Sequence, residues 1–285
     1  MELHNNIQEI SMETNYLFSG AKIEWSSTKE FIFSSKFESI LDQTEVKTIS
    51  LRQIIVKLSL AASVIILLGL ATFAMMYTKT VYSPAGTHLS MLLPDNSSAE
   101  LNAETSLSYY PYRWFFQRTV QLEGEAFFSV QKGKKFTVKS EMGETSVLGT
   151  SFNILARNQT YRVICMTGKV IVISNQDESV ILHPNQIAIL ESGNILKEEN
   201  LEAAEHMISW RKNMFLFNSV PFSEVLREIE RQYGISIATE ENLGGQLSVS
   251  FQKNMDVEKT LSMVCKPLGY RFIKKTENNY LISGK

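Results

Sequence analysis

The run Leu58–Tyr77 constrains this chain more than any other feature, because its 20 consecutive positions carry no charge. An α-helix of that length is about 30 Å long, which matches the hydrocarbon thickness of a bilayer. A helix satisfies its own backbone hydrogen bonds, so it can cross lipid that offers none. A buried helix of a soluble core normally keeps one polar side, and a signal peptide lies at the extreme N-terminus. We therefore predict one membrane span over 54–77, which divides a segment 1–53 from two domains, 78–200 and 201–285.

Basic residues near the two ends of the span predict its orientation. Lys47, Arg52 and Lys57 precede it, whereas Lys79 alone follows it closely and the next basic residue is Arg113. Cytoplasmic flanks are enriched in Lys and Arg. We expect the N-terminus in the cytoplasm and the C-terminus outside it.

The charge balance argues against direct nucleic-acid binding. The residues after the span carry 22 basic and 22 acidic side chains, and those before it carry 6 and 8. Nucleic-acid binders usually show a basic excess. No histidine has a partner at metal-ligand spacing, and no glycine-rich phosphate loop precedes a helix. We expect no enzyme activity, no cofactor and no metal; the histidines are His4, His88, His183 and His206.

The two cysteines, Cys165 and Cys265, each lie in an apolar pattern and are 100 positions apart. A disulfide is chemically allowed outside the cytoplasm. Nothing in the sequence brings the two together, so we favour buried free thiols.

The segment 1–53 contains a short amphipathic helix that needs a partner. Phe33, Phe37, Ile40 and Leu41 recur at the spacing of one helical face, and Trp25 lies upstream. So short a segment makes a poor core by itself. The helix either folds onto its own N-terminal arm or the membrane surface, or it docks in a groove of a cytoplasmic protein. Both interpretations remain open at this stage.

The region 78–200 alternates short apolar-polar runs with turn residues about every ten positions, which is typical of an antiparallel β sandwich or roll. Two of the expected strands, Thr119–Glu123 and Glu125–Val130, are separated at Gly124. The predicted fold class is mainly β, with one membrane helix ahead of the β domain.

Five blocks in this region resemble the FecR domain in order and spacing: Leu92–Ala103, Val120–Val130, Phe136–Val138, Val147–Ile154 and Gly168–Val172. The chain departs from the family pattern in having Asn96-Ser97 where Asp-Gly is common, and in the strongly aromatic run Pro111–Phe116. We interpret the motif residues as structural: the glycines sit where strands bend or backbones approach, and the two phenylalanines are expected in the core. These residues are Gly124, Glu125, Phe127, Gly149, Thr150, Phe152 and Asn153.

The region 201–285 predicts a small α+β domain with the order βαββαββ. Gly234 is placed to end its first helix and Asp256 to cap its second. The segments Phe215–Phe222, Glu224–Leu226 and Tyr233–Ile235 resemble the short N-terminal domain of secretins and TonB-dependent receptors. The same domain also lies at the C-terminus of FecR-type proteins of Bacteroidetes.

The FecR resemblance implies a single-pass inner-membrane anti-sigma factor. Its expected partners are an extracytoplasmic-function (ECF) sigma factor in the cytoplasm, the signalling domain of a TonB-dependent outer-membrane transporter in the periplasm, and the lipid bilayer. Trp25, Phe33, Phe37, Ile40 and Leu41 are the expected sigma-factor contacts. The alternative is a membrane-anchored periplasmic scaffold or ligand-binding module of an envelope complex.

Overall fold

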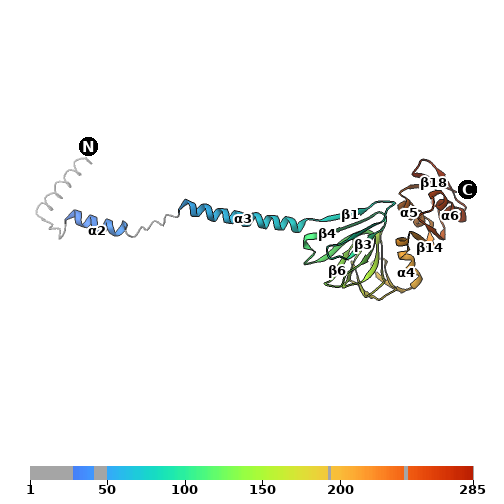
Figure 1. Cartoon of the computed structure of the whole chain (residues 1–285), viewed down its shortest axis with the longest axis horizontal. Coiled ribbons are helices and arrows are strands. Elements are labelled where there is room, and N and C mark those ends of the chain that lie inside the picture. Colours follow the sequence, from blue (N-terminus) through green and yellow to red (C-terminus); the bar gives the residue numbers. More distant parts are fainter. Residues whose placement is uncertain (1–27, 42–49, 192–193, 241–242, 285) are drawn as a thin grey trace, which may run out of the picture. The chain divides into compact units, whose positions relative to one another are not determined.

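The computed structural model of the chain describes residues 28–41, 50–191, 194–240 and 243–284 (Figure 1). Its contacts form two compact units, Met1–Ile66 and Leu67–Lys285. The predicted sigma-contact residue Trp25 lies outside the described residues. We describe the two units separately.

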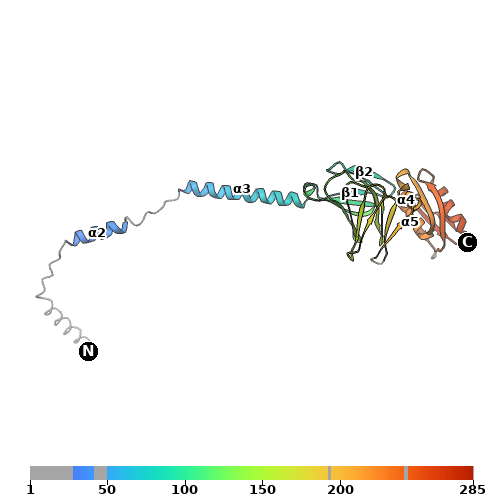
Figure 2. The same ribbon diagram turned by 90° about the horizontal axis from the view of Figure 1, so that it is seen from below.

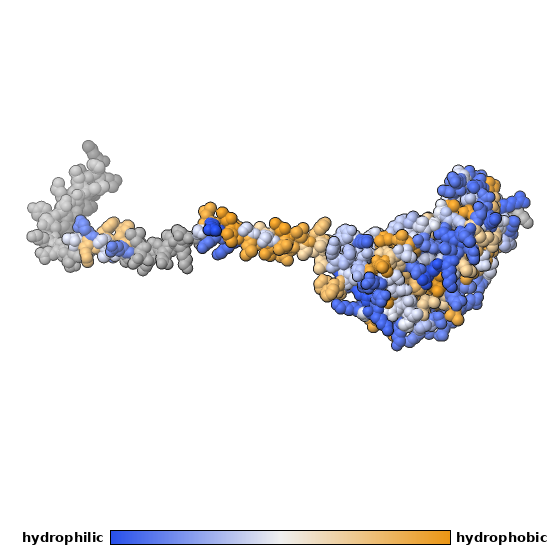
Figure 3. All heavy atoms as spheres, in the orientation of Figure 1, coloured by the Kyte–Doolittle hydropathy of each residue, from blue (hydrophilic) through white to orange (hydrophobic). Residues whose placement is uncertain are grey.

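Among the described residues, the helices α2 (Lys29–Leu41) and α3 (Leu51–Met76) precede the β domain. No residue of α3 is buried, and Figure 3 shows hydrophobic residues over much of its visible surface. By length and composition α3 can cross a membrane. It begins before the uncharged run and includes Arg52 and Lys57, whose long side chains can reach the headgroups from inside a helix. At 1.5 Å per residue its 26 residues extend about 39 Å.

Thirteen strands among the described residues form one continuous hydrogen-bonded system, which Figures 1 and 2 show from two sides. The strands are β1 (Lys79–Ser83), β2 (Leu89–Leu92), β3 (Ser98–Leu101), β4 (Thr105–Tyr109), β5 (Arg118–Ser129), β6 (Phe136–Lys139), β7 (Gly143–Val147), β8 (Ser151–Arg157), β9 (Thr160–Cys165), β10 (Val170–Ser174), β11 (Ser179–Leu182), β12 (Gln186–Glu191) and β13 (Asn194–Glu199).

The strands form two layers that share β5. The first layer runs β1-β4-β5-β6-β7-β10-β11 and uses the N-terminal half of β5. The second runs β2-β3-β5-β8-β9-β12-β13 and uses the C-terminal half. Side chains of both layers meet in one core, so the predicted mainly β sandwich is confirmed. Every pairing in it is antiparallel except β5 with β6, which is parallel.

The separation of β5 into two strands at Gly124 was wrong. The strand is continuous, and Gly124 (φ +122°) lies where it passes from one layer to the other. A Cβ at this position would lie 2.5 Å from Oγ1 and 2.7 Å from Cα of Thr105 in β4. A glycine is therefore required for close backbone approach within a strand, not for a turn.

Aromatic side chains fill the sandwich core. Phe128 of β5 stacks on Phe152 of β8 with ring centroids 5.3 Å apart, and Phe136 of β6 lies 5.9 Å from Phe128. All three are fully buried. Because Phe128 and Phe152 face each other across the β5–β8 ladder, each also fixes the register of the second layer.

The C-terminal region begins with α4 (Leu201–Ile208) and a 3-10 turn (Ser209–Lys212). It continues through β14 (Met214–Pro221), α5 (Phe222–Tyr233), β15 (Ser236–Thr239), β16 (Gln246–Gln252), α6 (Val257–Cys265), β17 (Arg271–Lys274) and β18 (Asn279–Ser283). This confirms the predicted βαββαββ order. Gly234 ends α5 in the left-handed conformation, and the Asp256 carboxylate caps α6 by accepting from the Glu258 and Lys259 amides.

Three elements were missed from the sequence: β1, β13 and α4. Strand β13 carries charges at Lys197, Glu198 and Glu199 and lies at an edge, where charge protects a free strand but hides the alternation that predicts one. Helix α4 has only eight residues; the Asn200 side chain caps it by accepting from the Ala203 amide, and Ala204 packs on Ile164 and Ile187 of the second layer.

Candidate functional site

The motif residues of β5 point alternately into the sandwich and away from it. Ala126 and Phe128 enter the sandwich core. Glu125 and Phe127, with the opposite parity, lie on the outer face of the second layer, and Phe127 is buried in a cluster made otherwise by the C-terminal domain. The C-terminal domain thus covers this face. We call the contact between the two domains the junction.

Glu125 is half-buried at the junction, between the buried side chains of Asn102 and Asn153. Its Oε2 accepts from Nδ2 of Asn102 at 2.7 Å, and its Oε1 accepts from Nδ2 of Asn153 at 2.9 Å. Burial, together with the nearby Glu228 carboxylate, raises the pKa of Glu125 above its ordinary value. The carboxylate is held by neutral amides, while the buried guanidinium of Arg157 opposes part of that shift.

Gln232 of α5 connects this carboxylate to the C-terminal domain. Its Nε2 donates to Oδ1 of Asn102 and to Oε1 of Glu228, both at 2.8 Å. Its Oε1 lies 2.9 Å from Nε2 of His88, and because an amide oxygen only accepts, the His88 nitrogen is the donor. Burial lowers the pKa of His88, which favours this neutral ring. We call Glu125, Asn102, Asn153, Gln232 and His88 the junction network.

A second contact lies beside this network. Arg211 donates from Nε and Nη2 to the two carboxylate oxygens of Glu100 at 2.8 and 2.6 Å. Its guanidinium also lies 3.6 Å from the ring centroid of Phe127. Glu100 and Phe127 are register partners in β3 and β5, so Arg211 contacts both of these neighbouring strands. A planar bidentate pair stacked on an aromatic ring fixes orientation as well as distance.

Helix α5 is also held through its last turn. The backbone oxygen of Arg231 accepts from the Gly86 amide at 2.8 Å, and the Gly86 oxygen accepts from Nζ of Lys253 at 2.7 Å. The Arg231 guanidinium bridges Glu228 on its own helix and Glu104 on the β domain, at 3.1 and 3.6 Å. The junction is therefore polar and directional rather than a plain apolar contact.

Unpaired polar atoms gather at this same place. Within the described part of the chain, five buried side-chain nitrogen or oxygen atoms lack a hydrogen-bond partner, and three of them are Asn153 Oδ1, Arg157 Nε and Trp210 Nε1. Such atoms cost free energy when they stay unpaired.

The other motif residues lie elsewhere. Phe152 is in the sandwich core. Gly149 passes close to the Lys132 backbone, where a Cβ would come within 2.8 Å of its Cα, and the Thr150 hydroxyl donates to the Lys169 oxygen at 3.1 Å. Both border a hollow of about 610 Å³ lined by apolar side chains and lysines. Its lining is Lys132, Gly133, Lys135, Ser146, Val147, Leu148, Gly149, Thr150, Lys169, Ile171 and Ile181.

The predicted sigma-factor contacts belong to the other unit. Phe33 and Phe37 stack on one face of α2 with ring centroids 4.7 Å apart, and they are 65% and 49% exposed. Ile40 and Leu41 lie in the last turn of the same helix. The structure thus provides an exposed aromatic pair on the expected face of α2.

Both cysteines are free and buried, as predicted. Burial raises the pKa of Cys165 and of Cys265 to about 11. Neither thiol is therefore a nucleophile near neutral pH.

Sequence reasoning missed Asn102, Gln232, His88 and Arg211. One signal was available: Gln232 continues the apolar stripe of α5 through Val225 and Ile229, and a polar residue at such a position needs a buried partner. The partner itself was not identifiable, because Asn102 lies 130 positions away.

Comparisons with known proteins match both domains that follow α3 in the sequence. The family model described as FecR protein matches residues 79–171, and the one described as FecR, C-terminal, matches residues 214–282. No curated protein sequence matches the chain.

Two crystal structures of a Parabacteroides distasonis ATCC 8503 protein assigned as an anti-sigma factor are also similar. The structure at 2.50 Å resolution is 28% identical with a TM-score of 0.66, and the alignment covers 73% of this chain and 100% of that one. The structure at 1.65 Å is 28% identical with a TM-score of 0.65, over 73% and 99% of the two chains.

Proposed function

This chain belongs to the FecR family of anti-sigma factors, and from that premise we propose that it is a single-pass inner-membrane regulator of an ECF sigma factor. One observation carries the proposal. Both FecR-type matches, 79–171 and 214–282, lie after α3, whereas the exposed aromatic pair of α2 lies before it. A helix able to cross a bilayer therefore stands between a sensing part and a sigma-binding part.

On the cytoplasmic side, α2 presents its stacked aromatic pair to the sigma factor. Burying an exposed Phe side chain in a partner groove contributes about 1.5–3 kcal/mol. Phe33 and Phe37 are only one turn apart, so one groove can take both. Trp25, Ile40 and Leu41 complete the proposed contact set.

A two-hybrid or co-purification assay with candidate sigma factors tests this face. We expect Phe37→Asp and Ile40→Asp to abolish binding. Phe31→Asp is the matched control, because Phe31 is equally exposed but points from the opposite side of α2, two positions from Phe33. Retained binding by Phe37→Asp, or equal loss with Phe31→Asp, would contradict the proposed face.

On the periplasmic side, the C-terminal domain receives the signalling domain of a TonB-dependent transporter. Among the described strands, β15 and β17 are the edges of the three-stranded sheet, and β14 and β16 each have one unpaired side in the two-stranded sheet. A partner strand can therefore add to either sheet by main-chain hydrogen bonds. Residues 78–285 should retain the transporter signalling domain in a pull-down. Failure with every candidate signalling domain of the same genome would refute this part of the proposal.

The junction passes the signal from the C-terminal domain to the β domain. A signal can shift such an equilibrium only if its ligand binds the two arrangements with different affinity. The junction supplies two sets of contacts that a movement of the C-terminal domain would break: the amide bridge through Gln232 of α5 and the bidentate pair of Arg211 with Glu100. We propose that transporter binding changes this packing and that the change ends or modifies sigma-factor binding.

A further inference from the structure

The connection between β4 and β5 carries an unusual exposed surface. We call Tyr110–Phe116 the aromatic loop. Tyr112, Phe115 and Phe116 in it are 60%, 78% and 71% exposed, whereas Trp114 between them is buried. Trp114 packs edge-on against aromatic rings of the core, so it holds the loop to the sandwich while its neighbours point outward. Two adjacent exposed phenylalanines on an ordered loop point to an apolar surrounding.

The aromatic loop lies at the C-terminal end of α3. Arg113 donates from Nε to the backbone oxygen of Met75 at 2.6 Å, and the rings of Tyr112 and Tyr77 lie 5.9 Å apart. The last carbonyls of a helix have no partner within it, and a cation there is favoured by the helix dipole. The loop is thus held at the point where α3 ends, through contacts that span 38 and 35 positions of the sequence.

We propose that the aromatic loop inserts Phe115 and Phe116 into the interface of the bilayer that α3 crosses, so that the β domain is seated on the membrane surface. This inference rests on the proposed membrane span. A helix of about 39 Å exceeds the hydrocarbon core by several residues, so its end at Met76 lies near the headgroups. The aromatic loop contacts that end of α3 and therefore lies at the headgroup level as well. Aromatic side chains are enriched at this level of the bilayer.

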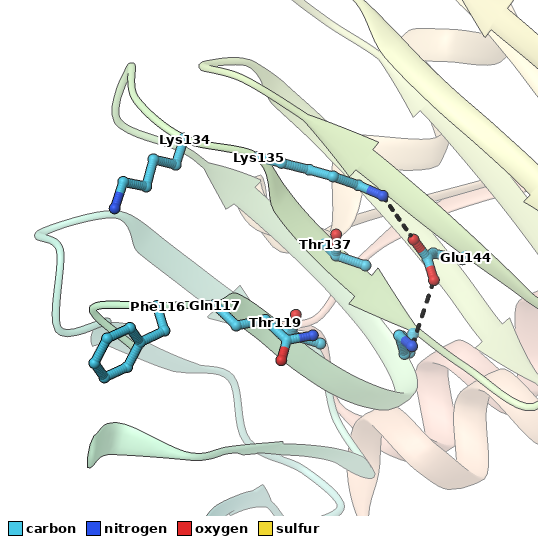
Figure 4. A pocket seen from close by; sticks show the side chains of 8 residues that line it. Phe116, Gln117, Thr119, Lys134, Lys135, Thr137 and Glu144 are labelled. Atoms are coloured by element: carbon cyan, nitrogen blue, oxygen red, sulfur yellow. Dashed lines mark hydrogen bonds and ion pairs between the residues drawn. The ribbon is translucent and has the colours of Figure 1, made fainter. Parts of the chain in front are cut away.

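Lysines beside the aromatic loop suit anionic headgroups. Lys134 lies 5.0 Å from the ring centroid of Phe115. A hollow of about 420 Å³ borders the end of the loop, and Figure 4 shows its side chains. Lys135 and Lys139 share a single carboxylate there, Glu144, at 3.2 and 3.6 Å, so the hollow keeps a net positive charge. The aromatic loop and these lysines therefore favour an anionic bilayer.

Depth-dependent fluorescence quenching of the full chain in nanodiscs tests the proposal. Phe116→Cys is labelled with a polarity-sensitive dye, and discs of phosphatidylethanolamine and phosphatidylglycerol contain lipids brominated near the headgroup or near the chain end. Ile273→Cys in the C-terminal domain is the matched control, because Ile273 is an exposed apolar side chain in β17. Ser63→Cys in α3 reports the span itself. The native thiols are buried and have raised pKa values, and the labelled parent chain gives their background.

The proposal expects the label at 116 to lose fluorescence to shallow bromines, the label at 63 to deep bromines, and the label at 273 to neither. Quenching at 63 without quenching at 116 overturns the inference and leaves the membrane anchor standing. No quenching at 63 overturns the span and the inference together. Equal quenching at 116 and 273 shows nonspecific adsorption and also overturns it.

Two further measurements keep the result independent of the label. Both the unlabelled parent chain and the double variant Phe115→Ser, Phe116→Ser are placed in anionic discs. Amide hydrogen exchange over 110–117 should be slower in the parent than in the variant. Discs of phosphatidylcholine alone should give less quenching at 116 than the anionic discs. Equal quenching in both lipids would overturn the role of the lysines, and unchanged exchange in the double variant would overturn insertion.

Discussion

Replacing Glu125 tests whether the junction network holds the β domain and the C-terminal domain together. In Glu125→Ala, the side-chain amides of Asn102 and Asn153, both buried, lose their acceptor. Each buried donor left unpaired costs about 1–3 kcal/mol. The nearby Arg157 guanidinium also loses a neighbouring negative charge, although removal of the buried carboxylate offsets part of the loss. We expect a net loss of about 3 kcal/mol in the free energy of unfolding.

Glu125→Gln separates the loss of charge from the loss of shape. The glutamine fills the site and keeps one acceptor oxygen for Nδ2 of Asn102. Its amide nitrogen donates to the otherwise unpaired Oδ1 of Asn153 when that side-chain amide turns over, which leaves one donor, Nδ2 of Asn153, unpaired. The substitution also removes a charge that burial disfavours. We expect a loss of about 1 kcal/mol or less, because one unpaired donor is offset by the neutral side chain.

Thermal unfolding of the full chain in detergent, followed by tryptophan fluorescence, measures both variants. A loss of about 3 kcal/mol corresponds to a fall in Tm of about 6–12 °C for a domain pair of this size. A Glu125→Ala variant within about 1 °C of the parent would refute the reasoning. So would a Glu125→Gln variant that is less stable than Glu125→Ala.

The pH dependence provides a second readout of the same residue. Because the pKa of Glu125 is raised in the folded state, its contribution to stability is complete below the ordinary pKa of 4.5 and is lost as pH rises through the folded pKa. The parent should therefore lose stability relative to Glu125→Gln as pH rises across that window. Parallel pH profiles for the two proteins would contradict a raised pKa.

Three further outcomes follow from the structure. Gly124→Ala should cost about 2 kcal/mol or more, because its Cβ would meet Thr105 at 2.5 Å in a conformation with positive φ; equal urea midpoints for variant and parent would exclude this clash. Cys165 and Cys265 should stay unmodified by iodoacetamide at pH 7.5 in the folded chain and react fully in denaturant, as mass spectrometry would show; rapid native labelling would mean that they are accessible. Arg211→Gln removes the bidentate pair with Glu100 and the cation stacked on Phe127, so amide hydrogen exchange at the junction should be faster. Exchange of β8 and β9 in the sandwich core should stay unchanged. Junction exchange identical to that of the parent would show that this contact contributes nothing.

Much of the fold could be predicted because it depends on local chemistry. The uncharged run predicts α3 whatever surrounds it, since its length and composition suffice. Alternation predicts most strands, and the cap at Asp256 and the left-handed Gly234 define the helices of the C-terminal domain. The errors have the same origin: charges on the edge strand β13 hid its pattern, and Gly124 in a strand has the same sequence signal as Gly124 in a turn.

The candidate site was harder to predict, because it joins segments that are distant in the chain. The resemblance supplied Glu125 and Asn153 as motif residues, with no indication that they face a second domain. Strand β5 is buried on both faces after Gly124, so its alternation cannot tell core from junction. Gln232 offered a clue as a polar residue in an apolar stripe, but its partner Asn102 is 130 positions away.

The apolar helix, the alternating strands and the capped helices of the C-terminal domain are encoded locally, because each follows from the preferences of neighbouring residues. The network of Glu125, Asn102 and Gln232 and the return of the aromatic loop to the end of α3 come from packing between distant segments. Those arrangements depend on which faces are covered by distant parts of the chain. Burial and hydrogen-bond pairing across such distances are fixed by the packed structure as a whole.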